Sequence, residues 1–333
     1  MNLSRNSPSL LAMADLATPM AIRVAATLGL AQRAGVGASV DELASRTGTF
    51  GPALRRLLDH LVAVGVFEAD EQGRYRATAL GNQMDPEAPE GFSLLLDMNA
   101  AGGRAELAFV ELLETITTGR PAYPRRYGRE FWADIDAEPA LRKSFDAQMN
   151  WRYRSYAQQI AERFDWARFG EILDVGGGDG ILLAAILQVH SGVRGRVLDL
   201  APTATAAAQR FSELGLTSRA GALVGSFFDP LPAGADAYVL SDILHDWDDE
   251  HASAILAGCA QAAGANGVVV VIEPIRGRGA DTAIDLFMLM CFGGKERTEE
   301  ELRELAARCG LVCHAAVAIA DGRTALEFRR APA

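Results

Sequence analysis

Basic side chains are in short supply in this chain. Its 333 residues include 32 Lys and Arg against 43 Asp and Glu, which gives a formal net charge of −11. A nucleic-acid backbone or an anionic membrane surface would be repelled by that charge rather than neutralised. We therefore expect no nucleic acid and no membrane among the partners, and a small molecule as the ligand.

Long apolar runs and cysteines are also scarce. The runs at 181–187 and 268–272 are far shorter than the roughly 20 residues needed to cross a bilayer, and the first ten residues lack the apolar core of a signal peptide. We therefore expect a cytoplasmic protein. Four cysteines are too few for a disulfide framework. Cys309, Cys313 and His314 lack a fourth ligand and the usual CxxC spacing, so we expect ordinary buried thiols and no metal.

Residues 1–92 have the pattern of a small helical domain. An amphipathic helix is predicted over 14–35, Ser39 and Glu42 have the spacing of a capping box, and Pro52 opens another amphipathic helix. The following segment alternates around Gly73 as a hairpin does. Helices followed by a hairpin form a winged-helix arrangement, all-α apart from that hairpin. Because the helices are apolar and carry few charges, we expect a homodimer interface rather than a DNA-binding surface.

Residues 93–165 are expected to form a helical linker, with a break at 117–132, that contributes to a substrate pocket. The linker is rich in aromatic side chains and Met, and a later segment, 287–292, is similar. Core packing explains any one of these residues, whereas as a group they could wall an aromatic ligand. The candidates for the substrate pocket are Phe131, Trp132, Phe145, Met149, Met288 and Phe292.

Residues 166–333 alternate between apolar strands and helical segments, which predicts an α/β domain with a mostly parallel, Rossmann-like sheet. In such sheets ligands bind beyond the carboxyl ends of the strands. The polar residues of interest all fall at predicted strand ends: Asp174, Asp199, Ser241, His245 and Glu273. We take this coincidence as the main internal sign of a binding site.

The turn after the first of these strands reads GxGxG, with Gly176, Gly178 and Gly180, and no frame of it fits the dinucleotide pattern GxGxxG. The loop holds no Lys or Arg, so no receptor for a pyrophosphate is apparent. Asp199 ends the next strand, where an acid can accept hydrogen bonds from both hydroxyls of a ribose. Adenosine without phosphates suggests S-adenosylmethionine. The alternative is a tight turn that binds nothing.

Six motifs occur in a fixed order along the chain: DVGGGDG, VLDL, GSFFDPLP, LSDILHDWDDE, VIEP and GGKERTEEEL. With them the chain resembles, over nearly its whole length, the S-adenosylmethionine-dependent small-molecule O-methyltransferases of plant phenolic and bacterial antibiotic pathways. It is most similar to actinobacterial naphthoate or polyketide O-methyltransferases. The resemblance implies an N-terminal winged-helix dimerisation domain and a C-terminal Rossmann-like methyltransferase domain that binds S-adenosyl-L-methionine without a metal.

The resemblance also implies roles for residues at the donor site. Gly176 and Gly178 would approach the methionine part of the donor, and Asp199 would hold its ribose. Ser226 and Phe227 would border the adenine. Plant relatives have an acid at position 226 and a lysine at 241, so the serines here imply different contacts. Two further candidates for donor binding are Ser241 and Arg152, the latter as a partner for the donor carboxylate.

The family's catalytic base lies in the HDW motif, which makes His245 the general base and Glu273 and Glu296 its partners. A phenol with a pKa near 10 needs its proton removed, and a histidine with an ordinary pKa near 6.5 is neutral at pH 7 and can accept it. Three alternatives stay open: methylation at carbon or nitrogen, a different reaction by a donor-bound enzyme of this fold, and a winged-helix regulator that senses a metabolite.

Overall fold

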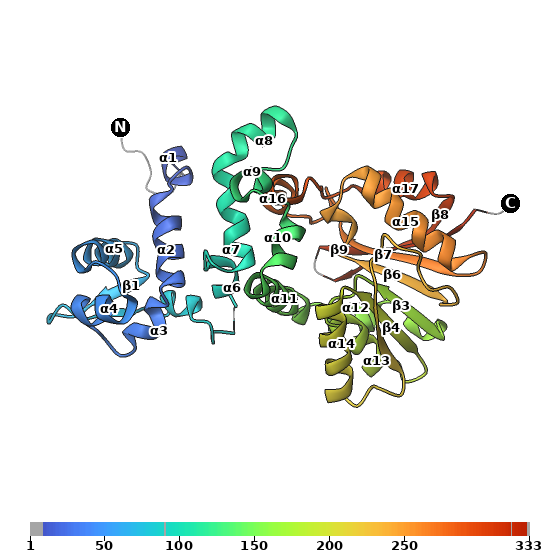
Figure 1. Ribbon diagram of the computed structural model, residues 1–333, viewed down its shortest axis with the longest axis horizontal. Helices are drawn as coiled ribbons and strands as arrows, with labels where there is room; N and C mark the ends of the chain where they lie inside the picture. The colour runs from blue at the N-terminus through green and yellow to red at the C-terminus, as the bar shows by residue number, and fades with distance from the viewer. Residues whose placement is uncertain (1–8, 90, 321, 332–333) are drawn as a thin grey trace. The chain divides into compact units, whose positions relative to one another are not determined.

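The computed structural model describes residues 9–331 except Glu90 and Asp321 (Figure 1). Within them the chain forms two compact units. The first runs to Leu107 and includes Glu138–Gln148, and the second comprises Ala108–Ala137 and the chain from Met149 onward. The segment 93–165, which we expected to be a linker, is thus divided between the two units.

The first unit begins with short helices and a two-stranded hairpin. Its elements are α1 (Leu10–Met13), α2 (Ala17–Thr27), α3 (Leu30–Ala34), α4 (Val40–Thr47), α5 (Gly51–Ala63), β1 (Phe67–Ala69), β2 (Tyr75–Ala77), η1 (Gly81–Met84), α6 (Ser93–Leu96) and α7 (Ala101–Glu106). The predicted capping box is present, because the Glu42 amide donates to Ser39 Oγ at 3.3 Å and the Ser39 amide donates to Glu42 Oε2 at 2.7 Å. Leu43, Leu58 and Leu61 form the fully buried centre of this unit.

The start of this unit carries an uncovered apolar face. The stretch Leu10–Thr27 is long and apolar enough, by length and composition alone, to cross a membrane, with a mean hydropathy of 1.3, and our sequence analysis did not single it out. It is weak evidence for a membrane span, because residues 14–16 interrupt the helix between α1 and α2. Leu10, Leu11 and Met13 are each at least 74% exposed.

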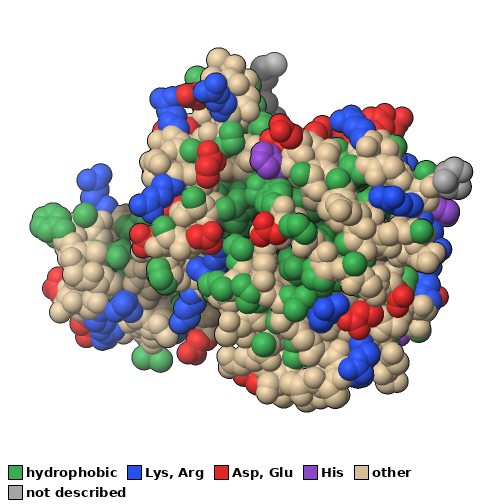
Figure 2. Space-filling model, turned by 45° about the vertical axis from the view of Figure 1, so that its right-hand side comes forward, with side chains coloured by type: hydrophobic (Ala, Val, Ile, Leu, Met, Phe, Trp, Pro, Cys, Tyr) green, Lys and Arg blue, Asp and Glu red, His purple; other side chains and the backbone are tan. Residues whose placement is uncertain are grey.

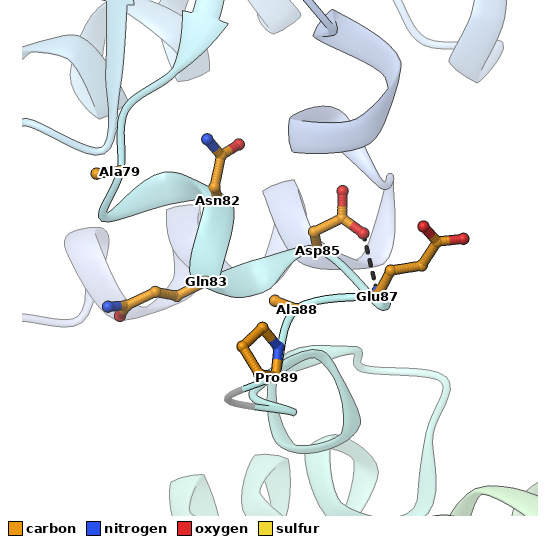
Figure 3. A pocket seen from close by; sticks show the side chains of 7 residues that line it. All are labelled: Ala79, Asn82, Gln83, Asp85, Glu87, Ala88 and Pro89. Carbon is orange, nitrogen blue, oxygen red and sulfur yellow. Dashed lines mark hydrogen bonds between the residues drawn. The ribbon is translucent and has the colours of Figure 1, made fainter.

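The first unit also has a surface cleft of about 350 Å³ between η1 and the loop that follows it (Figure 3). Its lining residues are Ala79, Asn82, Gln83, Asp85, Glu87, Ala88 and Pro89. Asp85 Oδ1 accepts a hydrogen bond from the Glu87 amide at 2.9 Å, which fixes the loop. No predicted site residue contributes to the cleft, and its charged side chains are all acidic.

The second unit is built on a seven-stranded sheet with the order β5-β4-β3-β6-β7-β9-β8. The strands are β3 (Glu171–Val175), β4 (Arg194–Asp199), β5 (Ala220–Val224), β6 (Ala237–Ser241), β7 (Val268–Pro274), β8 (Leu311–Ala320) and β9 (Arg323–Arg330). β5, β4, β3, β6 and β7 are parallel, and β9 is antiparallel to both β7 and β8. The mostly parallel sheet predicted from the sequence is confirmed.

Helices cover both faces of this sheet because its strands are apolar on both sides. Side chains of one face, such as Ile172 and Val239, pack with α12 (Ala157–Arg163), α13 (Ile181–Val189) and α14 (Ala201–Glu213). Those of the other, such as Leu173 and Leu240, pack with α15 (Asp249–Ala263) and α17 (Glu299–Arg308). The remaining elements are η2 (Leu107–Glu111), α8 (Leu112–Thr118), α9 (Tyr123–Tyr127), α10 (Phe131–Ala137), α11 (Pro139–Arg154), η3 (Trp166–Arg168), η4 (Leu244–Asp246) and α16 (Thr282–Phe292).

This topology fixes where a ligand can bind. Strand order reverses between β3 and β6, since the chain leaves β3 toward β4 and β5 and then returns to β6 on the other side. In sheets of this kind the ligand crevice lies beyond the carboxyl ends of such a pair of neighbours. The glycine turn follows β3, and η4, which carries His245, follows β6.

Candidate active site

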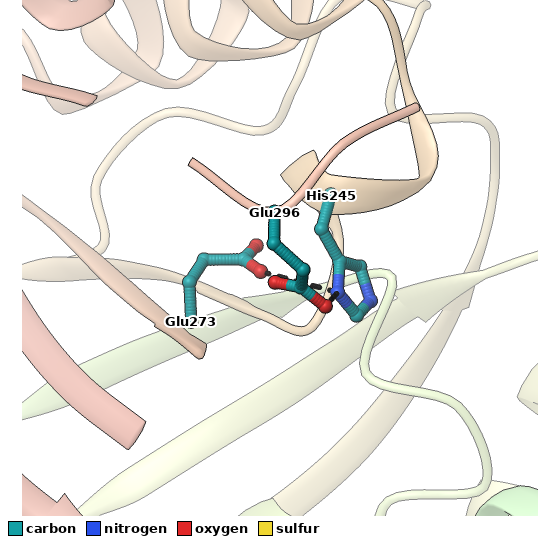
Figure 4. Close-up of side chains that lie close together, drawn as sticks. All are labelled: His245, Glu273 and Glu296. Carbon is teal, nitrogen blue, oxygen red and sulfur yellow. Dashed lines mark hydrogen bonds and ion pairs between the residues drawn. The ribbon is translucent and has the colours of Figure 1, made fainter. Parts of the chain in front are cut away.

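His245 is buried in η4 and lies among carboxylates from three parts of the chain (Figure 4). Its Nδ1 atom is 3.0 Å from Oε1 of Glu296 and 3.7 Å from Oε2 of Glu273, and its Nε2 atom is 3.6 Å from Oδ1 of Asp246. Glu273 comes from β7 and Glu296 from the loop after α16. The structure thus brings together the three residues that the sequence nominated for proton transfer.

The two glutamates contact different parts of the turn: Glu273 binds the backbone and Glu296 binds the imidazole ring. Oε1 of Glu273 accepts hydrogen bonds from the amides of Ile243 and Leu244, at 3.1 and 2.8 Å, and so fixes the backbone just before His245. Glu296 is the direct hydrogen-bond partner of the ring, and its own amide donates to Oδ1 of Asp285 at 2.8 Å. Glu273 positions the turn and adds charge, whereas Glu296 orients the imidazole.

Arg297 holds the same turn from the other side. Its guanidinium is buried and donates to the carbonyl oxygens of Leu244 and Trp247, at 2.6 and 2.8 Å, and to Asp249. Gly294 packs so tightly that an added Cβ would lie 2.1 Å from the carbonyl oxygen of His245. These contacts leave the backbone of η4 little freedom to move.

The carboxylates change the charge state that we expected for His245. Burial by itself lowers the pKa of the imidazole, but the charges of Glu273 and Asp246 and the hydrogen bond to Glu296 outweigh burial and raise that pKa to about 10. Burial raises the pKa of Glu273 to about 8 and that of Asp246 to about 6, although His245 opposes both shifts. The expectation of a neutral histidine at pH 7 is therefore wrong for the protein without ligands.

The cluster of His245, Glu273 and Glu296 also has the spacing of metal ligands. One atom from each residue lies within 4.8 Å of the other two, and Oε2 of both glutamates is buried without a hydrogen-bond partner among the described residues. A proton on the imidazole offers another explanation of the cluster, because Oε1 of Glu296, Oε2 of Glu273 and Oδ1 of Asp246 all lie within 3.7 Å of a ring nitrogen.

The glycine turn after β3 is shaped for a ligand that approaches the backbone. Gly176 has φ +72°, and a Cβ there would lie 2.7 Å from Ile243 Cδ1, while Gly178 has φ +61° and nothing within 4 Å of its Cβ position. The amide of Gly178 donates to Oδ2 of Asp199 at 3.0 Å, so the ends of β3 and β4 are tied together. This places Gly176, Gly178 and Asp199 in one region, as predicted.

The carboxyl group of Asp174 lies against this turn, next to Gly177. Its hydrogen bonding indicates whether a methyl donor fits here. Its Oδ2 is buried with no hydrogen-bond partner among the described residues, and burial, followed by the charge of Asp199, raises its pKa to about 7. An unpaired acceptor beside an open glycine backbone suits a ligand that brings ammonium or hydroxyl donors. The turn, Asp174 and Asp199 therefore fit S-adenosylmethionine, whose methionine and ribose carry such groups.

The other predicted donor residues lie around the same strand ends. The ring of Phe227 is 3.3 Å from the Cβ position of Gly176, whereas Ser226 Oγ accepts the Phe228 amide at 3.2 Å in its own turn. Ser241 ends β6, and its hydroxyl lies 3.1 Å from the hydroxyl of Tyr153. Arg152 is half-buried and close enough to Asp242 and Asp246 for its charge to favour the ionised form of both carboxyls.

Aromatic side chains of α10, α16 and the HDW motif form a stack in the second unit. The Trp132 ring lies nearly parallel to those of Phe292 and Trp247, with centroids 5.4 and 6.3 Å away, and Phe131 meets Phe292 edge-on at 4.8 Å. Met288 is buried and Met149 is half-buried in this unit. Phe145 belongs to the first unit, so the structure does not join it to the others.

Sequence reasoning missed several residues of the site. Asp246 and Trp247 lie inside the quoted HDW motif and Arg297 inside GKERT, so the motifs contained them, but nothing in the letters assigned them a contact. Asp242 lies inside the quoted LSDILHDWDDE motif but was assigned no role, and Tyr153 carried no signal that we used. Their contacts with the turn after β6 depend on how distant segments pack.

Comparison with known proteins agrees with this geometry. A family model described as an O-methyltransferase domain matches residues 109–312, and one described as an O-methyltransferase dimerisation domain matches residues 11–84. The second match covers Leu11, Met13 and the whole of α2, which favours a subunit contact over a membrane span for this apolar face.

Individual relatives cover nearly the whole chain. The 2,7-dihydroxy-5-methyl-1-naphthoate 7-O-methyltransferase of Streptomyces carzinostaticus is 53% identical over 92% of this chain and 92% of its own. The aclacinomycin 10-hydroxylase of Streptomyces purpurascens is 43% identical over 95% of this chain and 86% of its own.

A solved structure is similar throughout. It is that of an O-methyltransferase from neocarzinostatin biosynthesis in complex with S-adenosylmethionine and 2-hydroxy-5-methyl naphthoic acid. It superposes with a TM-score of 0.93 at 50% identity, over 98% of this chain and 100% of that one. With a family model over more than half of its length and whole-chain relatives above 30% identity, the chain belongs to the O-methyltransferase family.

Proposed function

We propose that this protein transfers the methyl group of S-adenosyl-L-methionine to a phenolic hydroxyl of an aromatic, polyketide-type metabolite, with His245 as the general base. The observation that carries the proposal is the buried imidazole, 3.0 Å from Glu296, at the strand ends beside the glycine turn. A base held there can take the proton of a hydroxyl brought to the same crevice.

Different residues of the site accept the proton, orient the imidazole and stabilise its charge. The donor supplies an electrophilic methyl group on a positively charged sulfur. Glu296 holds Nδ1 of His245, so Nε2 is the atom that accepts the phenolic proton. Glu273 and Asp246 stabilise the imidazolium that forms. Because the surrounding carboxylates favour the protonated ring, His245 must release its proton to solvent before it can accept one from the phenol.

The rest of catalysis is placement. Aligning the acceptor oxygen with methyl and sulfur can contribute several orders of magnitude without further chemistry. The flat stack of Trp132, Phe292 and Trp247 suits a planar ring system. The naphthoic acid described for the similar solved structure is a ring system of that kind. We extend this to a homodimer, on the basis of the dimerisation domain match, and to the cytoplasm, on the basis of the short apolar runs in the sequence.

A second candidate is hydroxylation of an aromatic metabolite, because a 43% identical relative is described as a hydroxylase. The retained histidine and both glutamates favour methylation, since removing a proton from the acceptor is their evident use. A regulator that binds DNA receives no support from the surface, where acidic and basic side chains are interspersed on the visible face (Figure 2).

The test is a product assay with the purified protein. It is incubated with S-adenosylmethionine and a panel of hydroxylated naphthoates, anthraquinones and simple phenols, and products are analysed by mass spectrometry and NMR. We expect a product heavier by one methylene unit with its new methyl on oxygen. A product that gains only an oxygen atom, or methylation on carbon or nitrogen, would overturn the proposal.

A further inference from the structure

We infer that Asp242 and Arg323 are positioning residues for methyl transfer: their ion pair, stacked on Tyr156, holds the turn after β6 in the conformation that presents His245. The inference rests on the proposed role of His245. Neither residue is among those the sequence analysis nominated, and neither touches the imidazole in a contact described above.

Asp242 has an unusual backbone. Its φ is +52°, and it is the sole non-glycine residue with positive φ in the described part of the chain. Residues other than glycine are uncommon in this left-handed region, where Asp occurs more often than most, and glycine would adopt the same conformation without cost. Such a conformation persists where the surroundings over-determine it, and it concentrates at functional sites. We therefore expect the Asp242 carboxylate to make a stabilising interaction that glycine, with no side chain, could not make.

That contribution is a buried ion pair with an arginine from the far end of the chain. Arg323 Nε donates to Oδ1 of Asp242 at 3.0 Å and Nη2 donates to Oδ2 at 2.6 Å, with both side chains at most 9% exposed. The guanidinium carbon lies 3.8 Å from the centre of the Tyr156 ring, and Nη2 also reaches the Tyr156 hydroxyl at 3.0 Å. The forked, stacked geometry is one that lysine cannot reproduce.

The pair acts on the site through the backbone. The Asp242 amide donates to the carbonyl of Ile272, next to Glu273, at 3.0 Å. Tyr153 donates to the carbonyl of Ser241 at 2.7 Å. The first part of the turn is thus held by Arg323 and Tyr153, while Glu273 and Arg297 hold the part around His245. Loss of the Arg323 contact frees one end of a turn whose other end carries the base.

A purely structural ion pair would behave differently. Its loss would change the stability of the fold. The turnover per folded molecule and the pH dependence of that turnover would stay at their wild-type values. A positioning pair lowers kcat with little change in donor binding, because a misplacement of about 1 Å at a reacting group costs on the order of 100-fold in rate.

The experiment compares Arg323→Met, Arg323→Lys, Asp242→Asn, Asp242→Ala and Asp242→Gly in the full-length protein. Arg329→Lys is the control, because Arg329 pairs with Glu327 at 2.9 Å on the same strand without reaching the turn. Folding is measured by thermal melting, and competent sites are counted by titration with S-adenosylhomocysteine. The kcat per competent site and the KM for the donor are then determined between pH 6 and 10.

We expect kcat per competent site to fall about 10- to 100-fold in Arg323→Met, and by a smaller factor in Arg323→Lys, with the donor KM changed less than about threefold. Asp242→Gly should retain more activity than Asp242→Ala, because glycine keeps the φ that the turn needs. Should Arg323→Met not fold, Arg323→Lys and the Asp242 series decide by the same criteria.

Wild-type kcat per competent site in the Arg323 and Asp242 variants that fold would overturn the inference. His245→Ala is measured in the same series. If His245→Ala loses activity and Arg323→Met does not, the positioning role alone is wrong. If His245→Ala keeps near-normal turnover, the base assignment under the proposed function is wrong, and the positioning role falls with it.

Discussion

The Nδ1 atom of His245 lies 3.0 Å from Oε1 of Glu296, and this contact decides which ring nitrogen can act as a base. With Nδ1 committed to the glutamate, Nε2 is left to accept a proton from the acceptor. The neighbour of Nε2 is Asp246 Oδ1, at 3.6 Å, which is too far for a strong hydrogen bond.

Replacing the imidazole should abolish most turnover. We expect His245→Ala to lower kcat by about 10²- to 10⁴-fold, the usual contribution of a general base, while the affinity for S-adenosylhomocysteine changes little. Steady-state kinetics and calorimetric titration measure the two quantities. His314→Ala is the control, since His314 is exposed on β8 and should keep wild-type rates. Turnover near the wild-type level in His245→Ala would remove the base from the mechanism.

Replacing Glu296 by its neutral analogue should move the pH profile. In Glu296→Gln the amide oxygen can still accept from Nδ1, but one of the charges that raise the pKa of His245 is lost. The rise of kcat/KM with pH should therefore occur at lower pH than in the wild type, and kcat should fall roughly tenfold because the imidazolium is less stabilised. A pH profile identical to that of the wild type would show that Glu296 does not set the proton affinity of the base.

Stability should fall as pH rises from neutral to alkaline values. His245, with an ordinary pKa of 6.5, has a pKa of about 10 in the fold, and Glu273, ordinarily at 4.5, has one of about 8. The folded protein thus binds more protons than the unfolded chain. The contribution of His245 is complete below pH 6.5 and is lost as pH rises through 10, and Glu273 adds a loss between pH 4.5 and 8.

Denaturant unfolding of the wild type and His245→Gln across pH 6–10 measures this effect. The stability advantage of the wild type should shrink steadily over that range. The groups facing the imidazole are Glu273, Glu296 and Asp246, with Asp242 further off, and Arg152 acts on Asp246 and Asp242. An advantage that is constant with pH would contradict the raised pKa of His245.

Alanine substitutions at Gly178 and Gly215 should separate the cost of backbone strain from the loss of a ligand contact. Gly178 and Gly215 have φ +61° and +68°, and neither has an atom within 4 Å of its Cβ position. Alanine at either position should therefore destabilise the fold by a similar amount, about 1 kcal/mol. Only Gly178→Ala should also weaken S-adenosylhomocysteine binding, by about tenfold or more, measured calorimetrically. Equal affinity in the two variants would show that the donor does not approach Gly178.

Removing divalent cations should not affect turnover, because the proton on His245 already accounts for the carboxylates around it. Activity measured after dialysis against a chelator should equal that before it. Added Zn²⁺ should instead inhibit, since it can displace that proton from ligands lying within 4.8 Å of one another. A chelated enzyme that regains lost activity on addition of a divalent cation would overturn the expectation.

The parts of the fold that follow from local pattern could be predicted from the sequence. The capping box of Ser39 and Glu42, the parallel sheet and the glycine turn depend on periodicity and on residues close in the chain. His245, Glu273 and Glu296 could be nominated because each lies in a motif of the family that the chain resembles. Glu273 lies at the end of β7, and His245 follows the end of the neighbouring strand β6.

What could not be predicted depends on contacts between distant residues. The raised pKa of His245 arises from the net effect of burial and surrounding charges, which no spacing reveals. Asp242 and Arg323 are separated by 81 positions in the sequence. No sequence pattern indicates that they pair or that Asp242 has a positive φ. Phe145 looked equivalent to Phe131 in the sequence, but the chain's path divides α11 between the two units.

The order of strands has a consequence for how the protein is made. Strand β7, which carries Glu273, lies between β6 and β9, and β9 is the last strand to be synthesised. On the ribosome, β7 therefore remains an open edge until β9 has emerged. A nascent chain arrested shortly before Arg323 can assemble the glycine turn and its neighbours, but it lacks the partner that closes the strand beneath the base. Competence to bind the donor should thus precede competence to use it.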